Sequence, residues 1–175
     1  MTTHKYTPVA ILIHWLTVLL VTSVFVLGWY MVDLPKGPTR GYYFALHKSI
    51  GLTIFCLLVI RVGWRLRHRP PAFPASISEW QRRLARSVHL SFYVLLVLQP
   101  LSGYLSSSFS GYTTQWFGLP LPSWGRHDAP LNELFTEIHE LCALGLLVLI
   151  AAHVMGFFGH LIAGDHELTR RMRPW

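Results

Sequence analysis

The chain has few charged residues, only two cysteines and no internal repeat. Charged residues make up 13% of its 175 residues, and only eight residues are acidic. No C-x-x-C-H string is present, which removes the sequence signal for covalent attachment of a c-type haem. Cys56 and Cys142 each lie inside an apolar stretch, and we interpret both as small buried hydrophobic residues.

Apolar residues are abundant instead, at 52% of the chain, with a mean hydropathy of +0.39. They gather in four charge-poor stretches of a length suited to crossing a bilayer, for which about 20 residues are needed. These stretches are residues 9–32, 42–60, 87–110 and 138–162. Only helices satisfy their own backbone hydrogen bonds in lipid. The sequence therefore predicts an all-α membrane protein, a bundle of four transmembrane helices forming a single domain over residues 1–175. The first stretch is too long for a signal peptide and is expected to remain as the first span.

The net charge is +7, and the basic residues are distributed unevenly among the connections. Four basic residues fall in the first and third connections, Lys36, Arg40, Lys48 and Arg126, whereas the other eleven fall at the N-terminus, in the central connection and at the C-terminus. Such a bias places both termini and the central loop in the cytoplasm. We therefore expect membrane lipid as a partner and no nucleic acid.

Two histidines, His139 and His153, lie fourteen residues apart in the last apolar stretch. On a helix this spacing returns to within about 40° of the same face after a rise of roughly 21 Å. One helix thus presents two imidazoles on one side at different depths. An imidazole in hydrocarbon needs a hydrogen-bonding or metal partner, so both residues are functional candidates.

Two further histidines match these depths from other stretches. With the predicted orientation, His14 pairs with His153 on the inner side, and His47 pairs with His139 on the outer side. Four helical imidazoles in two layers fit two b-type haems, each iron held between two axial histidines. Such iron is six-coordinate, which indicates electron transfer rather than oxygen binding.

Several other residues are candidates near the inner layer. His89 is a rival axial ligand or a proton carrier beside a quinone, and His160 is a ligand in a shifted register. Arg61 and Arg65 lie four residues apart on one helical face, where they are expected either to bind haem propionates or to anchor the helix at the headgroups.

The segments "ILIHWLTVLLV", "HKSIGLTIFCLLVIRVGWRLRHRPP", "WFGLPLP", "IHELCALGLLVLIAAHV" and "GDHELTRRMRP" resemble the bacterial dihaem cytochrome b561 family in order and spacing. The resemblance covers nearly the whole chain. It implies a multi-pass protein of the bacterial inner membrane with two b haems on His14, His47, His139 and His153. One branch of that family is a superoxide oxidase, which passes electrons from periplasmic superoxide to ubiquinone.

We therefore expect an oxidoreductase that transfers electrons between a periplasmic donor and ubiquinone. Lys36, Arg40 and Lys48 cluster beside His47, where they would attract an anionic donor such as superoxide. The outer connections as a whole carry four basic and five acidic residues. The alternatives are an electron-relay subunit docked to a partner redox enzyme and, with less support, a zinc or copper transporter. The sequence leaves the donor open.

Overall fold

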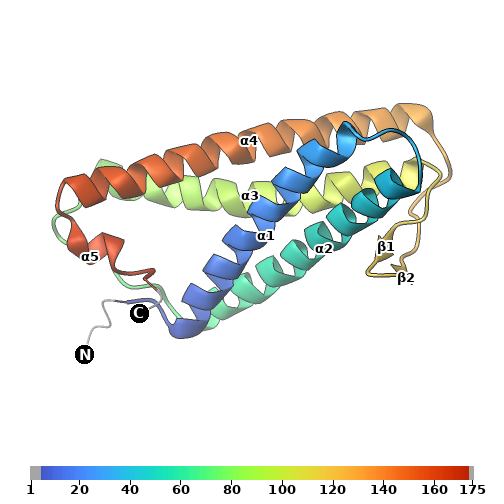
Figure 1. Cartoon of the computed structure of the whole chain (residues 1–175). Coiled ribbons are helices and arrows are strands. Elements are labelled where there is room, and N and C mark those ends of the chain that lie inside the picture. Colours follow the sequence, from blue (N-terminus) through green and yellow to red (C-terminus); the bar gives the residue numbers. More distant parts are fainter. Residues whose placement is uncertain (1–4, 174–175) are drawn as a thin grey trace.

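Four long helices run in alternating directions along the molecule (Figure 1). The computed structural model describes residues 5–173. The long helices are α1 (Pro8–Val32), α2 (Pro38–Arg67), α3 (Glu79–Phe109) and α4 (Ala129–Ile162). A hairpin of β1 (Gln115–Trp116) and β2 (Leu119–Pro120) lies between α3 and α4, and a short helix, α5 (His166–Thr169), follows α4. We call the end where α1 begins and α4 ends the terminal end, and the opposite end the hairpin end.

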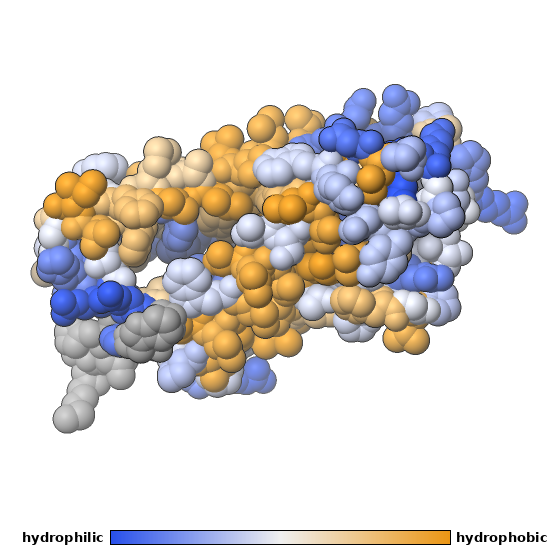
Figure 2. All heavy atoms as spheres, viewed as in Figure 1, coloured by the Kyte–Doolittle hydropathy of each residue, from blue (hydrophilic) through white to orange (hydrophobic). Residues whose placement is uncertain are grey.

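All four long helices are long and apolar enough to cross a membrane. Their large apolar side chains point outward as well as inward: Leu12, Leu19 and Leu144 are each at least 60% exposed. Figure 2 shows this apolar surface as a broad orange band along the helices, with hydrophilic residues gathered toward the ends. An apolar surface of this extent requires lipid around it. The predicted fold class, a four-helix membrane bundle, is confirmed.

The helices begin where the sequence provides caps. Pro8 and Pro38 occupy the first helical positions of α1 and α2, where a missing N–H costs nothing. Asp128 caps α4 by accepting from the Leu131 amide at 3.0 Å. At the start of α3, Gln81 Oε1 accepts hydrogen bonds from the Ser78 amide and hydroxyl, at 3.0 and 2.8 Å.

The bundle consists of two antiparallel helix pairs, α1 with α2 and α3 with α4, joined where α2 packs on α3. Among the described residues, no Cα atom of α1 comes within 8 Å of one of α4. Figure 2 shows a hollow between these two helices near the terminal end. The C-terminal segment bridges them, because the Trp15 indole donates to the Met172 carbonyl at 2.9 Å.

The β hairpin packs along α2 at the hairpin end. The Trp116 indole donates to Thr53 Oγ1 at 3.2 Å, and the Phe117 amide donates to Ser49 Oγ at 3.0 Å. Phe117 and Gly118, with φ values of 48° and 89°, form the two-residue turn that a tight hairpin prefers.

Candidate functional site

The histidines of the long helices gather at two depths. His47 on α2 and His139 on α4 form the hairpin-side pair, nine and ten residues from the ends of their helices. Their ring centres are 6.2 Å apart and the ring planes meet at 70°. The structure therefore brings together the two residues that the sequence assigns to the outer layer.

His139 is held by the backbone of α3. Its Nδ1 donates to the Gln99 carbonyl at 2.8 Å, and the Gln99 side-chain amide donates to its Nε2 at 3.1 Å. The first bond selects the tautomer in which Nε2 carries a lone pair, the form that binds a metal. Iron binding at Nε2 would displace the Gln99 amide, whose Oε1 is buried without a hydrogen bond.

Two glycines make room for the hairpin-side pair. A Cβ atom at Gly103 on α3 would lie 2.9 Å from His139 Cε1, so that any larger residue would push the ring. A Cβ atom at Gly28 on α1 would lie 3.5 Å from His47 Cε1. His47 Nδ1 is buried and makes no hydrogen bond of normal geometry, although the Val24 backbone lies close to it.

A second group, the terminal-side cluster, contains His14 on α1, His89 on α3 and His153 on α4. The rings of His89 and His153 are 5.8 Å apart, and His14 lies within electrostatic range of both. His153 is exposed although it lies in the apolar part of α4. The structure thus brings the predicted pair His14 and His153 into one cluster and places the rival ligand His89 beside them.

Arg61 contacts this cluster directly. Its Nη1 lies 3.3 Å from His14 Nδ1. Because a guanidinium only donates, Nδ1 accepts in this contact, and the ring proton is then on Nε2. Metal binding through Nε2 therefore requires Arg61 to release His14. Arg65 instead lies over the Tyr93 ring, 5.8 Å from its centre.

The three basic residues predicted to attract an anion are not alike. Lys36 is exposed in the first connection, and Arg40 stacks over Phe44 at 5.3 Å. Lys48 points toward α3, where its ammonium donates to Ser107 Oγ at 2.7 Å. Thr114 also donates to Ser107 at 2.7 Å, so Lys48 belongs to a partly buried polar network.

The distances between histidine rings bear on whether two of these histidines could bind one metal. Two imidazoles on opposite sides of one metal, with metal–nitrogen bonds of about 2 Å, have ring centres roughly 6 Å apart. The hairpin-side pair, at 6.2 Å, fits this requirement. The 5.8 Å separation of His89 and His153 is also close to it. Within residues 5–173, no three or more His, Cys, Asp or Glu residues gather as a site for a free metal ion.

His160 takes no part in either group in this structure. Its Nδ1 pairs with Asp165 Oδ2 at 2.8 Å, near the end of α4.

Sequence reasoning missed Gln99, Gly28 and Gly103. A signal was available for Gln99, which is a polar residue next to Pro100 inside the third apolar stretch. For the glycines no signal was available, because glycine is common in membrane helices for packing alone. At Gly51, one turn after His47, no protein atom lies within 4 Å of the place that a Cβ atom would take. A Cβ atom at Gly145 would contact Leu95 and not a histidine.

The chain is similar to known proteins over nearly its whole length. The family model of prokaryotic cytochrome b561 matches residues 5–175. Cytochrome b561 homolog 2 of Escherichia coli K12 is 34% identical, covering 98% of this chain and 93% of the relative. Cytochrome b561 homolog 1 of the same organism is 26% identical, covering 97% of both. A probable superoxide oxidase CybB of Yersinia pestis is 27% identical, covering 96% of both. With two layers of histidines in a four-helix membrane bundle and a match over nearly its whole length, the chain belongs to the prokaryotic cytochrome b561 family of membrane electron-transfer proteins.

Proposed function

We propose that this chain is a dihaem b-type cytochrome that transfers electrons between a periplasmic donor and ubiquinone in the bacterial inner membrane. The observation that carries the proposal is the grouping of helical histidines at two depths. His47 and His139 would hold one iron, and His14 and His153 the other, with His89 as the alternative partner of His153. The 6.2 Å separation of the hairpin-side rings supports the first assignment.

Haem b supplies reversible one-electron chemistry at its iron when bound. The chain's own residues determine how that chemistry is used. A haem held by two of these histidines would exchange electrons rather than bind oxygen. The Gln99 carbonyl fixes the His139 tautomer, and Arg61 and Arg65 would compensate the propionate charges near the terminal-side cluster.

The orientation follows from charge. Eleven of the fifteen basic residues lie at the terminal end, which we assign to the cytoplasm. His89 lies in the terminal-side cluster and would carry protons for a quinone bound nearby. The hairpin end would then meet the periplasmic donor.

Superoxide is our candidate donor. One similar protein is called a probable superoxide oxidase, and Lys36 and Arg40 at the hairpin end would attract an anion. Lys48, which is bound to Ser107, would contribute its charge from below the surface. If superoxide is not the donor, the alternative is a relay subunit that receives electrons from a partner enzyme.

Stopped-flow mixing of the purified protein with superoxide, with and without a soluble quinone, tests this function. We expect rapid haem reduction by superoxide and reoxidation by the quinone. Substituting Lys36→Gln with Arg40→Gln should slow the reduction and weaken its dependence on salt, since screening acts over about 10 Å at 0.1 M. The matched control, Arg67→Gln with Arg69→Gln, removes the same charge at the opposite end and should leave the rate unchanged.

The outcomes separate the alternatives. Equal rates in both double variants would reject electrostatic steering at the hairpin end. Haems that superoxide does not reduce would reject superoxide as the donor and favour the relay subunit. The reduction rate of a Lys48→Met variant separates the effect of the partly buried charge from the effect of the two surface charges.

A further inference from the structure

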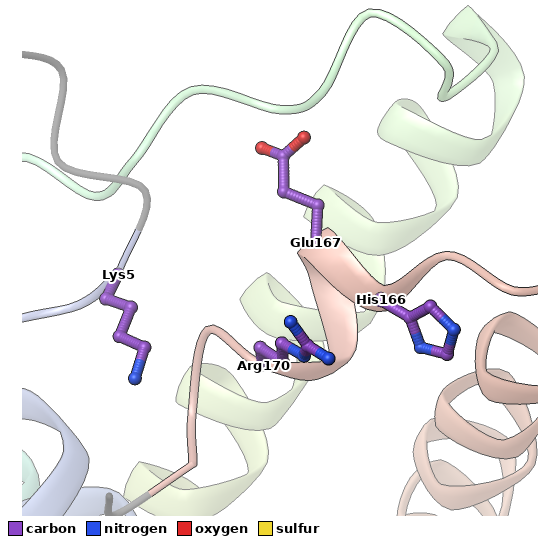
Figure 3. A pocket seen from close by; sticks show the side chains of 4 residues that line it. All are labelled: Lys5, His166, Glu167 and Arg170. Carbon is purple, nitrogen blue, oxygen red and sulfur yellow. The ribbon is translucent and has the colours of Figure 1, made fainter.

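Two adjoining cavities lie at the terminal end, outside both histidine groups. One, of about 350 Å³, is lined by Lys5, His166, Glu167 and Arg170. The other, of about 320 Å³, shares His166 and Arg170 and is completed by Phe157, Leu161, Thr169 and Arg173. Figure 3 shows that Lys5 and Arg170 reach the first cavity from segments at opposite ends of the sequence. The cavities therefore depend on the tertiary fold and not on one local motif.

The lining is strongly basic. Lys5, Arg170 and Arg173 are basic, and within residues 5–173 none of them forms an ion pair. The one carboxylate in the lining, Glu167, accepts a hydrogen bond from the Arg171 guanidinium at 2.9 Å. Because Arg171 balances Glu167, the cavities retain an excess of positive charge, which suits an anion with several oxygen acceptors.

One wall of the second cavity is apolar and faces outward. Phe157 and Leu161, on the last turns of α4, are 45% and 41% exposed, and Ile162 beside them is 87% exposed. These residues end a membrane-spanning helix, so the apolar wall continues into the lipid-facing surface. A soluble anion would use the cations but not this wall. A molecule with a phosphate and an acyl chain would use both.

We propose that these cavities bind an anionic phospholipid, with its phosphate between Lys5, Arg170 and Arg173 and an acyl chain along Phe157 and Leu161. Basic pockets at the membrane boundary are suited to anionic headgroups. A bound lipid would join the N-terminal segment to α5. It would thus reinforce the hydrogen bonds from Tyr6 to Arg171 and from Trp15 to Met172 that link α1 to the C-terminal segment.

Native mass spectrometry of the full-length, delipidated protein tests the proposal, with phosphatidylglycerol and phosphatidylcholine added at equal concentrations. We expect phosphatidylglycerol to be retained in preference. The double variant Arg170→Gln with Arg173→Gln should lose phosphatidylglycerol affinity by roughly tenfold or more, given the contribution of each basic residue at a membrane surface. The control, Arg67→Gln with Arg69→Gln, removes two charges from the same end outside the cavities and should retain it.

Three results would overturn the proposal. The first is equal phosphatidylglycerol binding in both double variants. The second is loss of bound lipid on adding millimolar inorganic phosphate, which would identify a site for a soluble anion. The third is a changed haem spectrum in the Arg170 and Arg173 variant, which would assign these residues to a haem. If that variant does not fold, Lys5→Gln in the N-terminal segment provides the same comparison, with weaker lipid binding expected.

Discussion

Gly103 and Gly41 are both glycines of membrane-spanning helices, but only Gly103 lies against a histidine. The ring of His139 is fixed by its bond to the Gln99 carbonyl and cannot turn away freely. At Gly41, exposed near the start of α2, nothing lies within 4 Å of a Cβ position. The two positions therefore form a matched pair for testing whether the hairpin-side pair holds a haem.

Gly103→Ala should disturb the hairpin-side haem, because the new methyl group displaces the His139 ring at a cost of about 1–3 kcal/mol. We expect a reduced haem content or a shifted low-temperature α-band in the optical spectrum. Gly41→Ala should leave both unchanged. Identical spectra for the two variants would contradict the role assigned to Gly103.

The two histidines of α4 should act separately. Because His139 and His153 belong to groups at different depths, His139→Ala should empty mainly the hairpin-side site, and His153→Ala mainly the terminal-side site. Redox titration of each variant should show one remaining midpoint potential. Loss of both haems from a still-folded bundle, or no loss, would reject the assignment.

His89 extends this comparison. If it replaces His14 as the partner of His153, His89→Ala should remove the terminal-side haem and His14→Ala should spare it. The sequence alone favoured His14 by depth and could not resolve this choice, because the rotation of each helix within the bundle determines which rings meet.

At the scale of elements, the sequence predicted the four helices because a charge-poor stretch of about twenty residues satisfies its own backbone hydrogen bonds in lipid by forming a helix. It did not predict a β hairpin docked on Ser49 and Thr53, because the contacts that hold Trp116 and Phe117 are far away in sequence.

The C-terminal segment is an element whose role is open to a direct test. Trp15→Phe removes the hydrogen bond to the Met172 carbonyl and keeps an aromatic ring beside His14. We expect a loss of about 0.5–1.5 kcal/mol in the free energy of unfolding. Thermal unfolding followed by circular dichroism measures it. Trp124→Phe, at the hairpin end and 67% exposed, is the control and should change little.

At the scale of the whole molecule, the expected cofactor content is two haems b per chain. A pyridine haemochrome assay combined with protein quantification should give a ratio of about two in detergent-purified protein, because the histidines form two groups. A ratio of one would limit haem binding to a single group. A colourless protein that binds only zinc would contradict both assignments.

The division of the bundle into two helix pairs has a consequence for assembly. The candidate ligands His14 and His47 lie on the α1–α2 pair, whereas His139 and His153 lie on the α3–α4 pair. With His14 as the partner of His153, each proposed iron would cross-link the two halves of the chain and add to the contacts that already join them. If the chain were cut in the connection between Arg67 and Glu79, the halves should insert separately and associate more stably when haem is supplied than when it is absent. Co-purification of the two tagged halves with and without haem synthesis would show this dependence.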